Sequence, residues 1–219
     1  MKDELENSLI NSIGKENLEN IAIDYGEIAL DSLITNNTLK DIPVINTVIA
    51  IAKTGLSVRD SILMKKILLF LFETKSMGYK EKKEFMASVN YESKYRTRVG
   101  EQLMIFLDKV DDFEKPRIIG RLFKNLVNKN ISYDLFLRLC SITIRSFTPD
   151  FKELARFSAG KEIETYSIEN LTNQGLLSVD IENKEKKKLT FKGIEEKSNP
   201  NLKYKMNQLS ELFLKYGLS

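Results

Sequence analysis

The segment 41–73 constrains the fold most, because it is the densest apolar part of the chain. It contains two apolar runs, residues 42–52 and 61–72. Pro43 suits the first turn of a helix, and S-V-R-D at residues 57–60 matches a capping box at the start of another helix. We therefore expect two consecutive helices here.

The second of these helices, over residues 58–73, is apolar around most of its circumference. Beyond the cap its only charged residues are Lys65, Lys66 and Glu73. A helix that is apolar on nearly all sides has to be surrounded by other elements. Arg59, Lys66 and Glu73 recur every seventh residue and form one polar stripe along it. We expect a mainly α protein, a multi-helix bundle around this central apolar helix pair.

Most of the chain before residue 150 shows apolar residues at intervals of three and four, the spacing of an amphipathic helix. We expect helices over residues 5–13, 16–34, 80–89, 91–110, 118–127 and 135–147. Tyr91 and Phe147 belong to the apolar stripes of the fourth and sixth of these, so both are expected to pack inward. Pro149 ends the last helix, because the residue before a proline disfavours helical backbone.

The pattern changes from Asp150 onward. Two short helices are expected, the first ending at Gly160 and the second at Gly175. Residues 176–181 alternate as a strand does, and 188–191 are expected to be the returning strand. A final helix is expected over 202–216. The sequence thus predicts a helical body over residues 1–149 and a small α+β subdomain over 150–219.

Two short stretches of this subdomain resemble a known fold. Gly175-Leu176-Leu177, followed by Leu189-Thr190-Phe191-Lys192-Gly193, resembles the G-L-L/I…L-T-x-x-G end of bacterial winged-helix domains. The resemblance implies a winged-helix-like segment. The whole layout also resembles small uncharacterised bacterial proteins with a helical body and such a tail, some of them prophage- or defence-associated. No catalytic or binding residue comes with this resemblance.

Composition excludes much catalytic chemistry. The chain has no histidine and a single cysteine, Cys140, so it lacks the commonest general base and cannot build a thiolate metal site. Neither G-x-x-x-x-G-K-[ST] nor G-x-G-x-x-G occurs. The S-x-x-K pattern of Ser/Lys acylases occurs at residues 12–15 and 158–161, but at expected helix ends, where that nucleophile does not belong.

A carboxylate cluster is the one remaining candidate for metal chemistry. Its members are Asp108, Asp111, Asp112 and Glu114. Carboxylates suit Mg²⁺, but helix capping accounts for the two central aspartates without an ion. We therefore expect no enzymatic activity, no cofactor and no metal.

Nucleic-acid contact is an alternative function, through a winged-helix regulator. The recognition helix would be residues 167–174, with Asn170, Asn173 and Gln174 able to touch bases. That helix has no Lys or Arg to neutralise phosphate. The wing has a suitable charge, carried by Lys184, Lys186, Lys187 and Lys188. A solvated turn explains this lysine run equally well.

The segment 42–72 carries a second alternative, contact with a partner or an anionic membrane surface. The cations available for it are Lys53, Arg59, Lys65 and Lys66. Its longest charge-free run, residues 42–52, falls well short of the roughly 20 residues that a membrane-spanning helix needs. A permanently buried core explains the segment as well.

The net charge of +3 gives no general attraction to nucleic acid or membranes. The first residues lack the basic-then-apolar order of a secretory signal. We expect a cytoplasmic, non-enzymatic protein that acts by contact with a protein partner or with a copy of itself.

Overall fold

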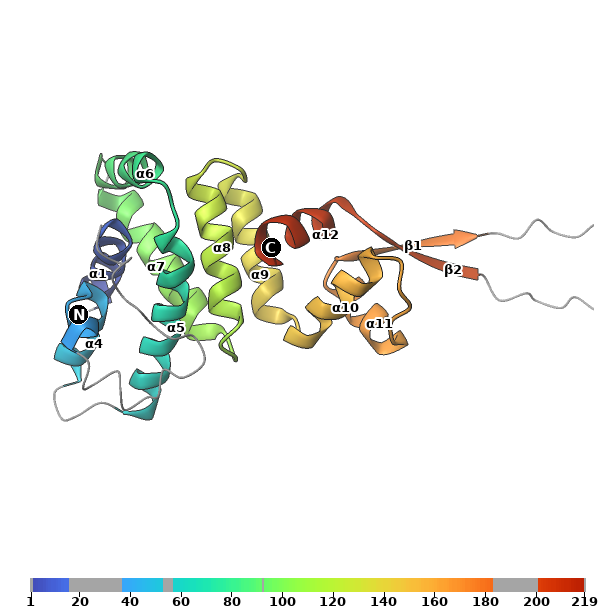
Figure 1. The fold of residues 1–219 in the computed structure, drawn as a ribbon, viewed down its shortest axis with the longest axis horizontal. Coiled ribbons are helices and arrows are strands. Elements are labelled where there is room, and N and C mark those ends of the chain that lie inside the picture. The colour runs from blue at the N-terminus through green and yellow to red at the C-terminus, as the bar shows by residue number, and fades with distance from the viewer. Residues whose placement is uncertain (1, 16–36, 53–56, 92, 183–200, 219) are drawn as a thin grey trace, which may run out of the picture. The chain divides into compact units, whose positions relative to one another are not determined.

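The structure is a computed structural model that describes residues 2–15, 37–52, 57–91, 93–182 and 201–218 (Figure 1). These residues are mainly helical, with one small two-stranded antiparallel sheet, which confirms the predicted mainly α class at that level. The predicted helix over 16–34, the returning strand over 188–191, the wing lysines and Lys53 lie outside the described residues.

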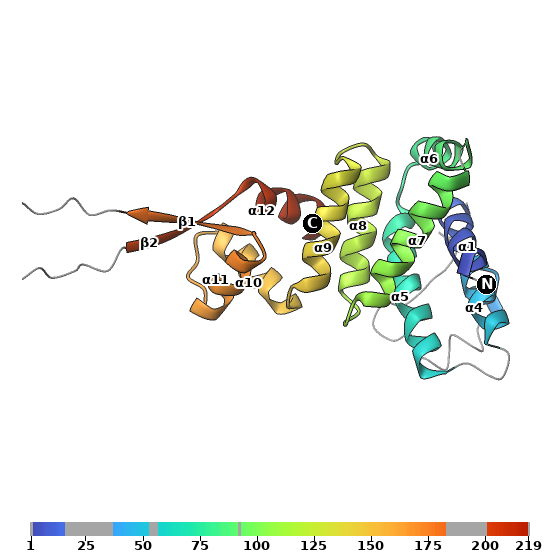
Figure 2. The same ribbon diagram turned by 180° about the vertical axis from the view of Figure 1, so that it is seen from behind.

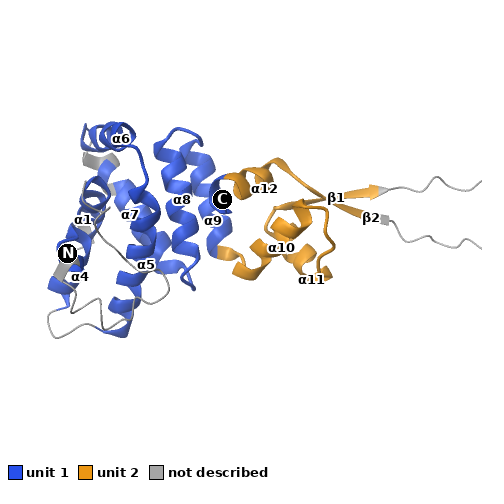
Figure 3. Ribbon diagram, in the orientation of Figure 1, with its two compact units in different colours: residues 1–144, 216–218 blue, residues 145–215, 219 orange. Residues whose placement is uncertain are grey.

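The chain divides into two compact units, one of residues 1–144 and 216–218, the other of residues 145–215 and 219 (Figure 3). The helices of the first unit are α1 (Lys2–Gly14), α3 (Asn37–Lys40), α4 (Pro43–Ile51), α5 (Val58–Lys75), α6 (Tyr79–Tyr91), α7 (Ser93–Lys109), α8 (Lys115–Val127) and α9 (Tyr133–Arg145), whose last residue falls in the second unit. The second unit contains α10 (Thr148–Ser158), α11 (Thr165–Asn173), β1 (Leu177–Glu182), β2 (Asn201–Met206) and α12 (Gln208–Phe213). A π-helical turn, Leu214–Leu218, follows α12.

The predicted capping box at the start of α5 is confirmed. The Ser57 hydroxyl accepts a hydrogen bond from the Asp60 backbone N–H, and the Asp60 carboxylate accepts one from the Ser57 backbone N–H, at 2.9 Å. The hydrogen bonds from Ser57 also lower the pKa of Asp60. The reciprocal bonds satisfy two backbone donors that the helix itself leaves unpaired, so they fix where α5 begins.

The middle of α5 is buried on every side. Five consecutive residues, 67–71, are buried, which a helix achieves only when neighbours cover its whole circumference. α5 packs chiefly along α8, and the two lie side by side in the views of Figure 1 and Figure 2. Phe70 on α5 and Phe123 on α8 have ring centroids 5.6 Å apart, and Phe136 on α9 lies 6.0 Å from Phe123. These rings form the aromatic centre of the unit.

Gly120 lets α5 and α8 approach closely. A Cβ added to Gly120 would lie 2.7 Å from Glu73 Cβ and 2.8 Å from the Phe70 carbonyl oxygen. Real Cβ atoms do not approach backbone so closely, so only glycine fits here. Gly100 on α7 plays the same part against α1, where a Cβ would lie 2.8 Å from the Glu6 carbonyl oxygen.

The two apolar segments predicted to form a central pair have different main partners. α4 begins at Pro43, as predicted, but packs chiefly against α1, whereas α5 packs chiefly against α8. The α1–α4 contact includes a buried hydrogen bond of 3.0 Å from the Val44 backbone N–H to the Ser12 hydroxyl.

Two aromatic residues predicted to pack inward do not. Tyr91 ends α6 and is 94% exposed, and Phe147 precedes α10 and is 66% exposed. Each fits the apolar spacing of a neighbouring helix but lies outside that helix. Tyr91 precedes α7, which starts at Ser93, and Phe147 follows α9, which ends at Arg145.

The helix ends predicted in the second unit are confirmed. Gly160 and Gly175 both have a positive φ, and the backbone N–H groups of Lys161 and Leu176 bond back to Arg156 and Leu171. This is the Schellman arrangement that favours glycine after a helix. Phe151 on α10 and Phe213 on α12 have ring centroids 5.0 Å apart in the core of this unit.

The final helix predicted over 202–216 is wrong in its first part. Residues 201–206 form β2, which pairs antiparallel with β1, and the helix α12 begins only after Asn207. Leu202, Tyr204 and Met206 alternate with two lysines, which is the period of a strand, although the same apolar residues also continue into a helical spacing. The side chain of Asn207 then caps α12, and this cap sets the boundary.

Candidate interaction site

The helix part of the predicted nucleic-acid contact lies on α11. Asn170 and Asn173 are exposed, and Gln174 follows the last helical residue and is half-buried. The Asn170 amide donates to the buried Asp150 carboxylate at 3.3 Å, and the Ser167 hydroxyl donates to the same carboxylate at 3.1 Å. This hydrogen bond joins the Asn170 side chain to α10.

The charge of α11 is unfavourable for a phosphate backbone. The helix has no Lys or Arg, while Glu164 at its start and Glu169 within it are exposed. Tyr166, 62% exposed, shares the open surface of the helix. Since Lys184, Lys186, Lys187 and Lys188 lie outside the described residues, the two halves of the predicted contact are not seen together.

The described cations of the predicted partner or membrane face have contacts inside the first unit. Arg59 lies 3.3 Å from Asp108, and Lys66 donates to the Val110 carbonyl oxygen at 2.7 Å. Lys65 lies 4.5 Å from the ring centroid of Phe113. All three therefore lie against the end of α7 and the loop that follows it.

Burial gives Lys66 a distinct electrostatic character. Desolvation lowers its pKa, and the charges of Asp108 and Asp111 only partly oppose this effect.

Among the described helices, none combines the length and apolar character that crossing a membrane requires.

The members of the carboxylate cluster each have a structural partner. Asp111 lies 2.6 Å from Lys115 Nζ, and the resulting hydrogen bond lowers the pKa of Asp111. The Asp112 side chain accepts hydrogen bonds from the backbone N–H groups of Glu114 and Lys115. No group of three or more His, Cys, Asp or Glu side chains in the described part of the chain is placed to hold a metal ion.

The two S-x-x-K serines are also used locally. Ser12 donates to the Ser8 carbonyl oxygen and accepts from Val44, while Ser158 donates to the Ala155 carbonyl oxygen. Cys140 is fully buried, and burial raises the pKa of its thiol, which disfavours the reactive thiolate.

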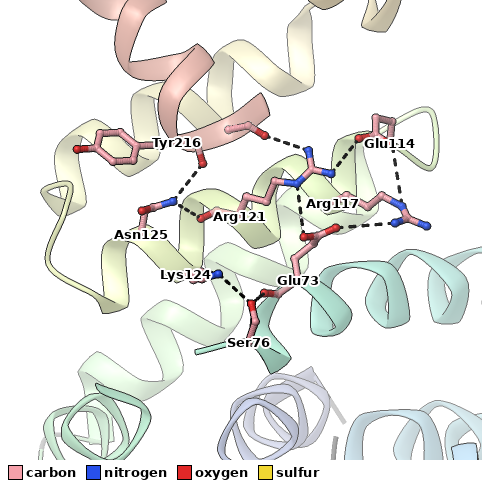
Figure 4. Close-up of polar contacts among 9 residues, drawn as sticks. Glu73, Ser76, Glu114, Arg117, Arg121, Lys124, Asn125 and Tyr216 are labelled. Carbon is pink, nitrogen blue, oxygen red and sulfur yellow. Dashed lines mark hydrogen bonds and ion pairs between the residues drawn. The ribbon is translucent and has the colours of Figure 1, made fainter. Parts of the chain in front are cut away.

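A polar network joins α5, α8 and residues 216–218 (Figure 4). Arg121 lies 3.4 Å from both Glu73 and Glu114, and Arg117 lies 3.8 Å from Glu73. Arg121 also donates to the Gly217 carbonyl oxygen at 3.2 Å. In these contacts two arginines face two glutamates, so their charges balance one another.

The β1–β2 ribbon has one uncharged face, which we call the ribbon face. Cross-strand pairing places three pairs on it: Leu177 with Met206, Val179 with Tyr204, and Ile181 with Leu202. Leu177 is buried at the base, but Val179 is 40%, Leu202 47% and Ile181 61% exposed. The exposure of the ribbon face therefore increases away from the helices.

The other face of the ribbon is polar. Asp180 and Lys205 form an ion pair of 2.6 Å there, and Lys203 lies on the same side. Sequence reasoning missed the ribbon face because it assigned Leu202 and Tyr204 to a helix. Their alternation with lysines is a strand signal, but a helical spacing through the same residues competes with it.

No protein-family model, no curated protein and no solved structure matches the chain. A fold by itself does not define a function, so the chemistry of the described surfaces has to carry the proposal.

Proposed function

We propose that this protein has no enzymatic activity and acts by contact with a protein, through the ribbon face. The observation that carries the proposal is the exposure of Val179, Ile181 and Leu202 together on one uncharged face. Single exposed apolar residues are ordinary, but apolar residues grouped on one face are typical of contact surfaces.

The energetics favour a weak contact. Fully burying a Val, Leu or Ile side chain contributes about 1.5–3 kcal/mol relative to leaving it exposed, and these three are already partly covered. A dissociation constant of about 1 μM corresponds to about 8 kcal/mol, after the cost of association is met. The ribbon face alone therefore supports a reversible contact.

A photoreactive amino acid tests the proposal in cells that express the full chain. Benzoylphenylalanine at position 181 should give a cross-linked protein adduct. The same group at position 58 should not, although Val58 is also apolar and is 71% exposed. Equal labelling at both positions, or no adduct at 181, would contradict the proposal. So would turnover of a substrate by the purified protein that a single substitution abolishes.

A winged-helix arrangement of the second unit, with DNA as the partner, is the second candidate. Its support is the order α10, α11, β1, β2, α12, together with the exposure of Asn170 and Asn173 on the helix before the ribbon. The lack of any cation on α11 weighs against it.

The DNA candidate makes a separate forecast. Affinity for duplex DNA should fall steeply with salt, and should drop when Lys186, Lys187 and Lys188 are all replaced by Ala. Equal binding by the triple variant would remove the wing as a DNA contact.

Contact of segment 42–72 with a membrane surface has less support, because Arg59 and Lys66 have partners within the first unit. Co-flotation of the full chain with anionic liposomes, weakened by replacing Lys65 with Glu, would favour it.

A further inference from the structure

We infer that Arg96, together with Asn11 and Asn90, forms a binding site for the phosphate group of a small soluble ester. The site lies in the first unit, where α1, α6 and α7 pack against one another. It is a different surface from the ribbon face, and it does not depend on the proposed function.

Three side-chain amides hold the guanidinium of Arg96, on α7, in a fixed position. Its Nε donates to Asn7 Oδ1 at 2.9 Å, and its Nη2 donates to Asn11 Oδ1 at 2.6 Å. Its Nη1 donates to Asn90 Oδ1. Asn7 and Asn11 lie one turn apart on α1, and Asn90 lies in the last turn of α6. Contacts from two other helices therefore immobilise a side chain that is otherwise rich in rotamers.

These contacts do not neutralise the charge of Arg96. Amides are neutral, and no carboxylate in the described part of the chain forms an ion pair with this guanidinium. Four other described arginines do meet an aspartate or glutamate in this way: Arg59, Arg117, Arg121 and Arg156. Since a guanidinium is always charged in proteins, Arg96 presents a fixed positive charge without a counter-charge.

The hydrogen-bonding groups that remain around this charge are donors. A guanidinium has five N–H groups, and each terminal nitrogen of Arg96 keeps one N–H after its bond to an asparagine. Because the oxygens of Asn11 and Asn90 face the guanidinium, their NH2 groups are left for a ligand, and both residues are exposed. The site therefore suits an anion with several oxygens.

The number of donors favours phosphate over a carboxylate. A phosphate ester offers three strong acceptor oxygens and close to two negative charges near neutral pH. A carboxylate offers two oxygens and a single charge. Phosphate therefore uses more of the N–H groups of Arg96, Asn11 and Asn90 and gains more from the uncompensated charge.

Titration of the isotope-labelled full chain with sodium phosphate, followed by NMR, tests this inference. The Arg96 Nε–H signal and the side-chain amide signals of Asn11 and Asn90 should shift and saturate. Phenyl phosphate should produce the same shifts, because the recognised group is the phosphate. Sodium chloride at equal ionic strength should not, since it only screens charge. Sodium acetate should bind more weakly than phosphate.

Asn11→Asp separates ligand binding from a purely structural role of Arg96. It keeps the shape of the side chain but supplies the missing counter-charge. Phosphate affinity should fall by roughly tenfold or more through like-charge repulsion, while the melting temperature stays equal or rises. Asn90→Asp serves as a second variant with the same expected result. Asn173→Asp adds an equal charge at an exposed position of α11 and should leave the affinity unchanged.

Several results would overturn the inference. They are the absence of saturable shifts, the same shifts with chloride, and binding of acetate as tight as that of phosphate. Unchanged phosphate affinity in both Asn11→Asp and Asn90→Asp would mean that Arg96 only joins the three helices. None of these results bears on the ribbon face, so the proposed function stands or fails separately.

Discussion

The ammonium group of Lys115 lies 2.6 Å from Asp111 Oδ1, although Lys115 is 1% exposed and the Asp111 side chain 75% exposed. The same ammonium donates to the Ile144 carbonyl oxygen near the end of α9, at 3.2 Å. Lys66 and Lys82 likewise donate hydrogen bonds to backbone carbonyl oxygens, those of Val110 after α7 and Lys15 after α1. Cations there satisfy unpaired carbonyl groups and the negative end of the helix dipole.

The Lys115–Asp111 pair should respond unequally to removal of its two partners. Asp111→Ala leaves a buried cation without its counter-charge, and we expect a loss of about 1–3 kcal/mol in the free energy of unfolding. Lys115→Met should cost less, since it keeps the apolar stem and leaves Asp111 in water. Urea unfolding of both variants gives the comparison, and a larger cost for Lys115→Met would contradict it.

The same pair predicts a dependence of stability on pH. The hydrogen bond from Lys115 lowers the pKa of Asp111 from its ordinary value of 3.8. As the pH falls, the unfolded chain binds this proton first. The contribution of Asp111 is therefore complete above its unfolded pKa and is lost as the pH drops through the folded pKa.

Urea unfolding at a series of pH values measures this effect. The difference in unfolding free energy between the parent and Asp111→Ala should stay constant near neutral pH and shrink in acid. In a Lys115→Met background the same comparison should lose this dependence, because the hydrogen bond is gone. An unchanged acid-side difference there would contradict the assignment.

Gly120 and Gly160 make a matched pair for substitution by alanine. At Gly120 the new Cβ meets backbone at 2.8 Å, whereas at Gly160 it meets nothing within 4 Å but the φ of +72° is unfavourable. Overpacking typically costs about 1–3 kcal/mol, and at Gly120 we expect the upper end of this range because the clash is with the Phe70 backbone, which cannot rotate away. A left-handed backbone costs about 1–2 kcal/mol. Calorimetry should show the larger loss in melting temperature for Gly120→Ala, even though alanine favours helix more than glycine does. An equal or smaller loss would mean that α5 and α8 can separate at little cost.

Local sequence motifs predict an element boundary where no second pattern competes with them. The capping box at Ser57 and the glycines after α10 and α11 each specify a local backbone geometry, and these boundaries could be predicted. Residues 201–206 satisfy both strand and helix periods, and only pairing with β1 decides between them. That choice depends on a distant segment and could not be made locally.

In the candidate site, too, some features follow from local sequence and others depend on tertiary packing. The exposed amides Asn170 and Asn173 could be found from their place on a short helix, but the hydrogen bond from Asn170 to Asp150 depends on how α10 and α11 pack. The ribbon face required the register of β1 with β2, which no single segment encodes. The partners of Arg59 and Lys66 at the end of α7 likewise come from tertiary packing.

The apolar segment 41–73 gives a graded prediction. Leu68 is 2% exposed on α5, so Leu68→Asp buries an unpaired carboxylate, which costs several kcal/mol. Total stability is about 5–15 kcal/mol, so the cooperative thermal transition should be lost. Ile49 on α4 is half-buried, and Ile49→Asp should lower the melting temperature and keep the transition. A parent-like melt of Leu68→Asp would refute the assignment of this segment to the core.

Arg121 and Asn125 should control the order of the last described turn. They donate to the carbonyl oxygens of Gly217 and Tyr216, both at 3.2 Å. A net loss of about 1.4 kcal/mol is tenfold in an opening equilibrium. The double variant Arg121→Met, Asn125→Ala should therefore raise amide hydrogen exchange in Leu214–Leu218 by roughly tenfold. Lys124→Met removes a neighbouring hydrogen bond, from Lys124 to the Ser76 hydroxyl at 2.9 Å, and should leave that exchange unchanged. Equal protection in the double variant and the parent would mean that apolar packing, and not the two carbonyl contacts, holds the turn in place.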